Sequence, residues 1–325
     1  METHKGLCMK VEMFAFPSPV SKLYYHWNKG MEVHGDTVQQ LTREDDIRLA
    51  DVGNCYFQTN ERKKKFFTGE RHETQGKYFD YILASKKPFS VAESNPLRQY
   101  EGWLRFGWNS YKWTEGNFNN DNVDRDRWKR FENLTGIKFK DWNSPGDNIL
   151  IMGQKEGDSA LNSMYDKGFD NLYDWLLSTV RKIRKVTDRP IVIRPHPRGL
   201  KKGLKNFKNV IEEKEIANVT FSENVESGGN QGGSGLDYDL DNAHCVVTYN
   251  SLSSVEAVIK GIPVFAMDDG CMTYPISHTK LGQIENINYN IDITDWQNKI
   301  AYTMWNKDDV KTGTTWAHLK PVYFK

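Results

Sequence analysis

The sequence contains no apolar run of the roughly 18 residues that a membrane-spanning helix needs. Residues 1–5 also lack the charged and apolar blocks of a secretory signal peptide, so we expect no membrane span and a cytoplasmic location. Cys-x-x-Cys pairs are absent, because the four cysteines lie far apart: Cys8, Cys55, Cys245 and Cys271. That spacing argues against a disulfide framework and against a structural zinc site.

No Gly-x-Gly-x-x-Gly motif follows a predicted strand, which disfavours an NAD-linked dehydrogenase. The chain does contain enough apolar material for two cores, with 38% hydrophobic residues, 13% aromatic residues and ten Trp, despite a mean hydropathy of -0.70. Its 325 residues exceed the size at which one core usually stops growing, so two lobes are expected. The formal net charge of +1 is unlike that of a dedicated nucleic-acid-binding domain.

The second half of the chain alternates short apolar, β-branched runs with helical patterns. A helix is predicted over 170–185 from the spacing of its apolar residues. The predicted strands are 148–152, 191–193, 219–221, 245–248 and 263–266. This alternation is typical of a doubly wound parallel sheet, whose ligands bind at the carboxyl ends of the strands.

Two of these strand ends carry residues suited to phosphate. Prolines on both sides of His196 fix its imidazole just beyond the second predicted strand. His196 can then donate to a phosphate oxygen, with Arg194 or Arg198 nearby. Lys155 adds a cation after the first predicted strand. These four residues are therefore candidates for binding an anionic donor.

The fourth predicted strand runs into a serine-rich turn and then into a helix that ends at Gly261. Hydroxyls and unpaired N–H groups at a helix start attract phosphate. The candidate donor-binding residues here are Ser251, Ser253, Ser254 and Glu256. A structural alternative stays open, in which any one of the serines is an ordinary helix cap and His196 is a packed loop residue.

In order along the chain, Arg194–Pro197, the serine turn, Glu256–Ala257 and Gly261–Val264 resemble the nucleotide-binding half of GT-B glycosyltransferases. The resemblance is in particular to capsule Kdo transferases and bacterial sialyltransferases, which use CMP-sugars. It implies that His196, Ser253 and Ser254 contact the donor phosphate. It also implies the fold class, which is α/β and GT-B-like, with two Rossmann-like lobes and a donor cleft between them.

The middle of the chain resembles a glycosyltransferase-like family encoded by tailed bacteriophages, through residues 106–110, 115–120, 126–128 and 188–190. Some phage enzymes of this general kind put sugars on hydroxymethylated pyrimidines in DNA. By that analogy we expect a DNA acceptor, with Arg105, Trp108 and Asn109 as acceptor-binding residues. The alternative is that this aromatic stretch forms an ordinary core patch.

The predicted domains are an N-terminal, acceptor-side lobe over 1–146, a nucleotide-sugar-binding lobe over 147–291, and a tail over 292–325. In GT-B folds such a tail crosses back to the first lobe, and residues 292–305 look helical. First-lobe strands are predicted at 10–14, 81–83 and 89–93. The last of these ends on Glu93, which is the candidate general base.

Basic residues cluster in three places. Residues 181–208 contain eleven Lys or Arg against the single acid Asp188, and residues 62–67 and 125–130 interleave cations with aromatics. Such patches can hold a phosphate backbone and stack on bases. The alternative for residues 181–208 is an ordinary solvated helix end and loop, in which two of the cations contact the donor nucleotide.

Sugar transfer requires stabilisation of the departing phosphate, for which His196, Lys155, Arg194, Ser253 and Ser254 are the candidates. Asp268 and Asp269 could touch ribose, sugar hydroxyls or a metal, but we favour donor binding without metal or other cofactor. The hypothesis is transfer from a CMP- or UDP-sugar to a hydroxymethylpyrimidine in DNA, and retaining and inverting chemistry both stay open. The alternatives are a capsule or surface-polysaccharide transferase, and a non-catalytic nucleotide-sugar or DNA-binding module.

Overall fold

The computed structural model describes residues 10–14, 21–41, 52–55, 86, 88–94, 96–97, 103–196, 208, 211, 216–223 and 234–324. The chain divides into two units. The first comprises Met1–Asn95, Tyr100–Trp128 and Asn298–Lys325, and the second comprises Pro96–Gln99 and Lys129–Gln297. Among the described residues, no helix combines the length and the apolar character needed to cross a bilayer.

Five parallel strands form the sheet of the second unit, and all five were predicted from the sequence. In spatial order they are β10 (Val264–Ala266), β9 (Ala243–Thr248), β6 (Asn148–Met152), β7 (Ile191–Arg194) and β8 (Val219–Phe221). Met152 at the end of β6 pairs with Arg194 on one side and Thr248 on the other. The carboxyl ends of the three central strands are therefore level.

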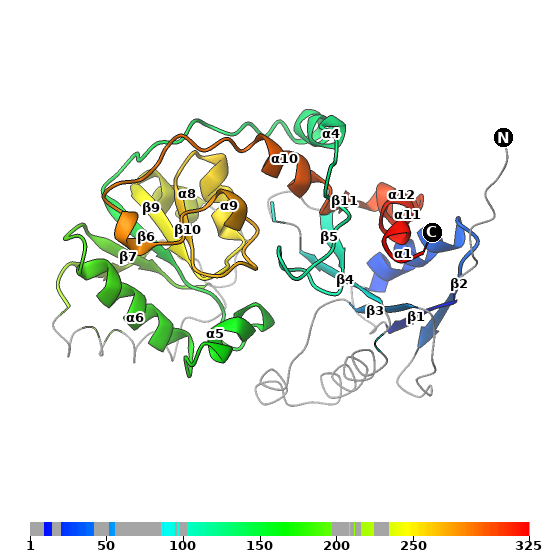
Figure 1. The fold of residues 1–325 in the computed structure, drawn as a ribbon, viewed down its shortest axis with the longest axis horizontal. Helices are drawn as coiled ribbons and strands as arrows, with labels where there is room; N and C mark the ends of the chain where they lie inside the picture. Colours follow the sequence, from blue (N-terminus) through cyan, green and yellow to red (C-terminus); the bar gives the residue numbers. More distant parts are fainter. Residues whose placement is uncertain are drawn as a thin grey trace. The chain divides into compact units, whose positions relative to one another are not determined.

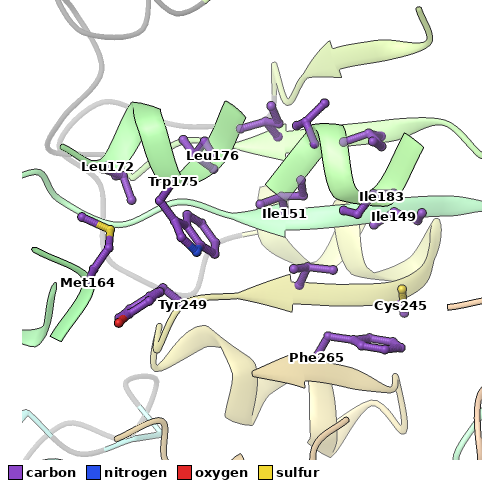
Figure 2. Close-up of a cluster of buried hydrophobic side chains, with 14 of the residues drawn as sticks. Ile149, Ile151, Met164, Leu172, Trp175, Leu176, Ile183, Cys245, Tyr249 and Phe265 are labelled. Carbon is purple, nitrogen blue, oxygen red and sulfur yellow. The ribbon is translucent and has the colours of Figure 1, made fainter. Parts of the chain in front are cut away.

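Helices cover both faces of this sheet, with α6 (Leu172–Arg184) on one face and α8 (Ser234–Asp241) and α9 (Ser253–Ile259) on the other (Figure 1). The predicted helix over 170–185 is thus confirmed as α6, which begins after Asn171, whose side chain accepts from two backbone N–H groups. Figure 2 shows the apolar stripe of α6 against β6, with Ile149 and Ile151 fully buried. Shorter elements of this unit are η1 (Ser159–Leu161), α5 (Asn162–Asp166), η2 (Tyr274–Ile276) and η3 (Leu281–Gln283).

The first unit contains a mixed six-stranded sheet. Its order is β11 (Met304–Asn306), β5 (Trp103–Trp108), β4 (Phe89–Ser94), β3 (Val52–Cys55), β1 (Lys10–Phe14) and β2 (Thr37–Leu41). Strands β1 to β4 run parallel, whereas β5 is antiparallel to both of its neighbours. Among the described residues, the helices that lie wholly within this unit are α1 (Ser21–Glu32), α11 (Lys307–Lys311), α12 (Thr314–Leu319) and η4 (Lys320–Val322). Two further helices, α4 (Asp126–Thr135) and α10 (Thr294–Ala301), cross the boundary between the units.

Aromatic side chains dominate the core of the first unit. The ring of Trp27 stacks on that of Phe106 at a centroid distance of 4.6 Å and meets Trp316 edge-on at 5.6 Å. Trp108 lies 5.8 Å from Trp316, and its Nε1 donates to the carbonyl of Leu319 at 2.8 Å. The core therefore joins α1, β5 and α12, which are far apart in sequence.

Two buried ion pairs also join distant segments of the first unit. The carboxylate of Asp36 accepts from Trp316 Nε1 at 2.5 Å and from Lys320 Nζ at 2.8 and 2.9 Å. The guanidinium of Arg127 pairs with Asp309 at 3.1 Å and lies 3.6 Å from the ring centroid of Trp305. These contacts hold residues 304–320 to the rest of the unit.

The structure differs from the sequence expectation in two places. Residues 292–305 are not one helix, because α10 spans Thr294–Ala301 and Trp305 lies in β11, where it pairs with Leu104. Burial of Trp305 in the aromatic core overrides its helical pattern.

The boundary between the two units lies after residue 128 rather than after residue 146. The segment before β6 belongs to the second unit, because Trp142 Nε1 donates to the carbonyl of Ile291. The strand expected at 81–83 lies outside the described residues.

Candidate functional site

The order of the second sheet creates a topological switch point between β6 and β9. From β6 the chain proceeds to β7 and β8 on one side, and then continues with β9 and β10 on the other side. Loops that leave the carboxyl ends of β6 and β9 therefore part in opposite directions. In open α/β sheets this is the place where ligands bind.

Two amide side chains bridge these strand ends. Gln154 follows β6 and Asn250 follows β9. Gln154 Nε2 donates to Asn250 Oδ1 at 2.7 Å, and the backbone N–H of Asn250 donates to Gln154 Oε1 at 3.1 Å. Asn250 Nδ2 also donates to the carbonyl of Ala160 at 2.6 Å. The two loops and η1 are thus fixed to one another.

Asp268, which follows β10, extends this network. Its Oδ2 accepts from Asn250 Nδ2 at 2.9 Å and its Oδ1 accepts from Ser163 Oγ at 2.7 Å. Tyr249 Oη donates to Ser163 Oγ at 3.0 Å, and burial raises the pKa of the Tyr249 hydroxyl, so it stays neutral. Because the Asp268 side chain is 1% exposed and both of its oxygens accept hydrogen bonds, its carboxylate serves to hold the loops together.

His196 and Lys155 lie on the neighbouring strand ends. The backbone N–H of Gly153 donates to the carbonyl of Arg194 at 2.8 Å. A Cβ on Gly153 would lie 3.0 Å from that carbonyl oxygen and 3.8 Å from His196 N, so the glycine permits this close approach. His196 is partly exposed at this edge of the sheet. The structure therefore brings the loop containing Gln154 and Lys155 beside His196.

The three serines of this turn have different roles in the structure. Ser251 Oγ accepts from Ser253 N at 3.3 Å, which makes Ser251 a turn-forming residue. Ser253 begins α9 and is partly exposed, as is Glu256 one turn later. Ser254 is fully buried, and its Oγ lies 3.4 Å from Cys271 Sγ. The expected phosphate contact of Ser254 does not fit this position, because one helical step rotates its side chain away from the edge and into the core.

Arg194 also differs from its expected role. Its guanidinium forms a close ion pair with the buried Asp239 of α8 and donates to Ser222 Oγ at 3.3 Å and to the carbonyl of Gly235 at 3.2 Å. Arg194 thus joins β7 to α8, and a phosphate would have to compete with a buried carboxylate for it. Arg198 lies outside the described residues.

On the first unit, the structure places Glu93 and Arg105 opposite each other. They are cross-strand partners on β4 and β5, and Glu93 lies near the carboxyl end of β4. Glu93 is partly exposed, whereas Arg105 is buried with its guanidinium 5.2 Å from the ring centroid of Tyr111. Arg105 therefore contributes to the interior, next to the candidate base.

Trp108 and Asn109 lie at the other end of β5. Trp108 is fully buried in the aromatic core, so its indole is not available for stacking on an acceptor. Asn109 adopts a left-handed conformation with φ 67°, and its Nδ2 donates to the hydroxyl of Tyr323 at 2.7 Å. Residues 106–108 of β5 separate Arg105 from Asn109, and three steps of extended strand span about 10 Å. The three candidate acceptor residues are therefore not brought together around Glu93.

The basic segments are largely used within the fold. Arg184 donates to four backbone carbonyls, and Arg189 pairs with Glu285 at 2.9 Å and with Asp147 at 3.1 Å. In the segment 125–130, Trp128 is buried, which removes it as a stacking surface. The exposed cations of these segments are Arg125, Lys129, Arg130, Arg181, Lys182 and Lys185. Residues 62–67 and 197–207 lie outside the described part of the chain.

Sequence reasoning missed the polar groups that join the strand ends. Gln154 and Asn250 each stand at the second position beyond a predicted strand, which is a signal that could have found them. Ser163 and Lys167 carry no such signal, because they come from the short helix α5 and the residue after it. Their approach to Asp268 depends on how the loop after β6 folds.

No protein-family model matches the chain, and no curated protein matches it. Among solved structures, the chain is similar to KpsC of Thermosulfurimonas dismutans, a beta Kdo 2,7 transferase. The two share 13% sequence identity with a TM-score of 0.47, and the match covers 90% of this chain and 89% of that chain.

Proposed function

We propose that the protein is a glycosyltransferase of the GT-B type that binds a CMP- or UDP-sugar at the carboxyl edge of β6, β7 and β9. The observation that carries the proposal is the switch point itself. There, Gln154 and Asn250 fix two diverging loops, and His196 lies on the adjoining strand end. An edge built in this way presents backbone N–H groups, hydroxyls and an imidazole to one ligand.

The proposed chemistry uses these groups on the departing nucleotide. As the bond between the sugar and the phosphate breaks, negative charge develops on the phosphate oxygen. His196, Lys155 and Ser253 stabilise that charge by donating hydrogen bonds, while Gln154, Asn250 and Asp268 hold the loops in position. In this proposal the donor site requires neither a metal nor another cofactor besides the nucleotide-sugar.

Glu93 is proposed to accept the proton of the acceptor hydroxyl. Its support is a position near the carboxyl end of a parallel strand, partial exposure, and the basic side chain of Arg105 opposite it in the sheet. The proposed acceptor is a hydroxymethylpyrimidine in DNA. This proposal rests on the resemblance of residues 106–110, 115–120, 126–128 and 188–190 to a phage family and on the exposed cations Arg125, Lys129 and Arg130.

The experiment that tests this function is a transfer assay with purified protein. CMP-, UDP- and GDP-sugars are each combined with duplex DNA containing hydroxymethylpyrimidine, with unmodified duplex, and with surface-polysaccharide acceptors. We expect product only with one donor and hydroxymethylated DNA, and loss of product in His196→Ala. Transfer to a polysaccharide alone would overturn the DNA acceptor, whereas nucleotide binding without transfer or donor hydrolysis would indicate a non-catalytic binding module.

A further inference from the structure

Lys167 lies at the carboxyl edge of the second sheet, although it comes from neither of the motifs that the sequence singles out. It follows α5, and its backbone N–H donates to Ser163 O at 3.1 Å, which fixes its position. Its Nζ lies 3.5 Å from Asp268 Oδ1 and 5.2 Å from the ring centroid of Tyr249. The ammonium group is therefore held between the loops that follow β9 and β10.

The two members of this ion pair differ greatly in exposure. The side chain of Lys167 is 52% exposed, whereas that of Asp268 is 1% exposed. Asp268 already receives shorter hydrogen bonds from Ser163 at 2.7 Å and Asn250 at 2.9 Å. An ammonium group has three N–H donors, and one of them at most is directed at Asp268. Lys167 is thus attracted to the edge by a buried carboxylate that does not use up its hydrogen-bonding capacity.

Two other cations of the same unit show the contrast. Arg194 is enclosed by Asp239, Ser222 and Gly235, and Lys260 pairs at 3.0 and 2.7 Å with Asp237 and Asp241. Both have close carboxylate partners, so an incoming anion would have to displace them. The long contact of Lys167 needs no such displacement.

We infer that Lys167 binds a phosphate group of the donor nucleotide, with Asp268 and the ring of Tyr249 holding its ammonium in place. This inference rests on the proposed function, because it assigns a further ligand within the same site. A compact ammonium suits phosphate as a point charge, and the neutral Tyr249 hydroxyl adds no negative charge nearby. Lys167 is accordingly a specificity-determining residue for phosphorylated over unphosphorylated ligands.

The test is isothermal titration calorimetry of CMP, UDP, cytidine and uridine with the wild type, Lys167→Ala, Lys167→Arg and the control Lys182→Ala. Lys182 is an exposed lysine in the last turn of α6, away from the carboxyl edge. We expect Lys167→Ala to weaken binding of the preferred nucleotide about tenfold or more, as loss of a charge-assisted hydrogen bond does. Binding of the matching nucleoside should stay unchanged, Lys167→Arg should retain most of the affinity, and Lys182→Ala should behave as the wild type.

The outcomes separate this inference from the proposed function. If the wild type binds a nucleotide and Lys167→Ala binds it equally well, the inference is wrong and the donor site stands. Equal weakening of nucleotide and nucleoside would also overturn it, because it would indicate distortion of the loops rather than loss of a phosphate contact. If the wild type binds no nucleotide, the proposed donor site fails first and the inference fails with it.

Discussion

Two buried polar networks, one in each unit, have different roles. In the first unit, Asp36 and Arg127 join segments that are far apart along the chain, and each is enclosed by its partners. In the second unit, Asn250 and Asp268 gather at one edge of the sheet, where His196 and Lys167 are partly exposed beside them. The comparison teaches that a buried polar network indicates a candidate site when it positions exposed side chains. A network whose members contact only one another has a structural role.

The largest expected effect is on the free energy of unfolding, when the Asp36 network of the first unit is broken. Asp36→Ala leaves the ammonium of Lys320 and the indole N–H of Trp316 without their acceptor in a buried place. We expect a loss of about 3–5 kcal/mol in the free energy of unfolding, measured by chemical denaturation. The nucleotide affinity of the folded variant should equal that of the wild type. A tenfold loss of affinity would contradict the division of roles between the units.

A variant of the Asn250 network in the second unit should lower both the free energy of unfolding and the nucleotide affinity. Asn250→Ala removes the side chain that joins Gln154, Ala160 and Asp268, so Gln154 Nε2, the carbonyl of Ala160 and the buried Asp268 Oδ2 each lose a hydrogen bond. We expect a loss of roughly 2–3 kcal/mol in unfolding free energy, from the typical cost of unsatisfied buried groups, together with at least tenfold weaker nucleotide binding. Asn242→Ala, which alters an exposed asparagine, is the matched control. Unchanged nucleotide affinity in Asn250→Ala would remove this network from the site.

The neighbouring serines of α9 sharpen the comparison within a single helix turn. Ser253→Ala should weaken nucleotide binding about fivefold, since it removes a neutral hydrogen-bond donor from the exposed edge. Ser254→Ala should leave nucleotide affinity unchanged, because its hydroxyl faces Cys271 in the core. Calorimetric titration of both variants measures the difference. The reverse pattern would mean that Ser254, as the sequence resemblance implies, is the phosphate contact after all.

The smallest expected effect concerns pH. Burial lowers the pKa of His318 in the first unit and of His278 in the second, with opposing hydrogen bonds only partly offsetting it. The unfolded chain takes up these protons at the ordinary pKa of about 6.5, so their neutral forms favour the folded state above that pH and stability falls as pH drops below it. Denaturation at pH 7.5 and pH 5.5 should show this loss, and His318→Gln should reduce it. An unchanged loss in the variant would exclude His318 as a contributor.

The sequence predicted the second unit well, because its strands are short runs rich in apolar and β-branched residues that pair with similar runs. Residues 148–152 and 219–221 match β6 and β8 in both bounds. The position of His196 at a strand end followed from the same reasoning. What the sequence did not reveal was the direction of individual side chains, since Ser254 and Arg194 turn inward toward partners from distant segments.

The first unit was harder to predict for a physical reason. Its core depends on contacts between segments separated by about two hundred residues or more, such as Trp108 with Leu319 and Asp36 with Trp316. Local periodicity carries no information about such pairings. For the same reason Trp108 was equally compatible with a ligand-facing loop and with a core, and the structure places it in the core.

The most direct test of the donor site is thermal unfolding of the wild type and His196→Ala with CMP, UDP, GDP or no nucleotide. A ligand present at a hundred times its dissociation constant stabilises the folded state by about 2.7 kcal/mol, which raises the unfolding midpoint measurably. We predict that one nucleotide raises the midpoint of the wild type and leaves that of His196→Ala unchanged. Absence of a shift with every nucleotide, or an equal shift in the variant, would contradict a donor site built around His196.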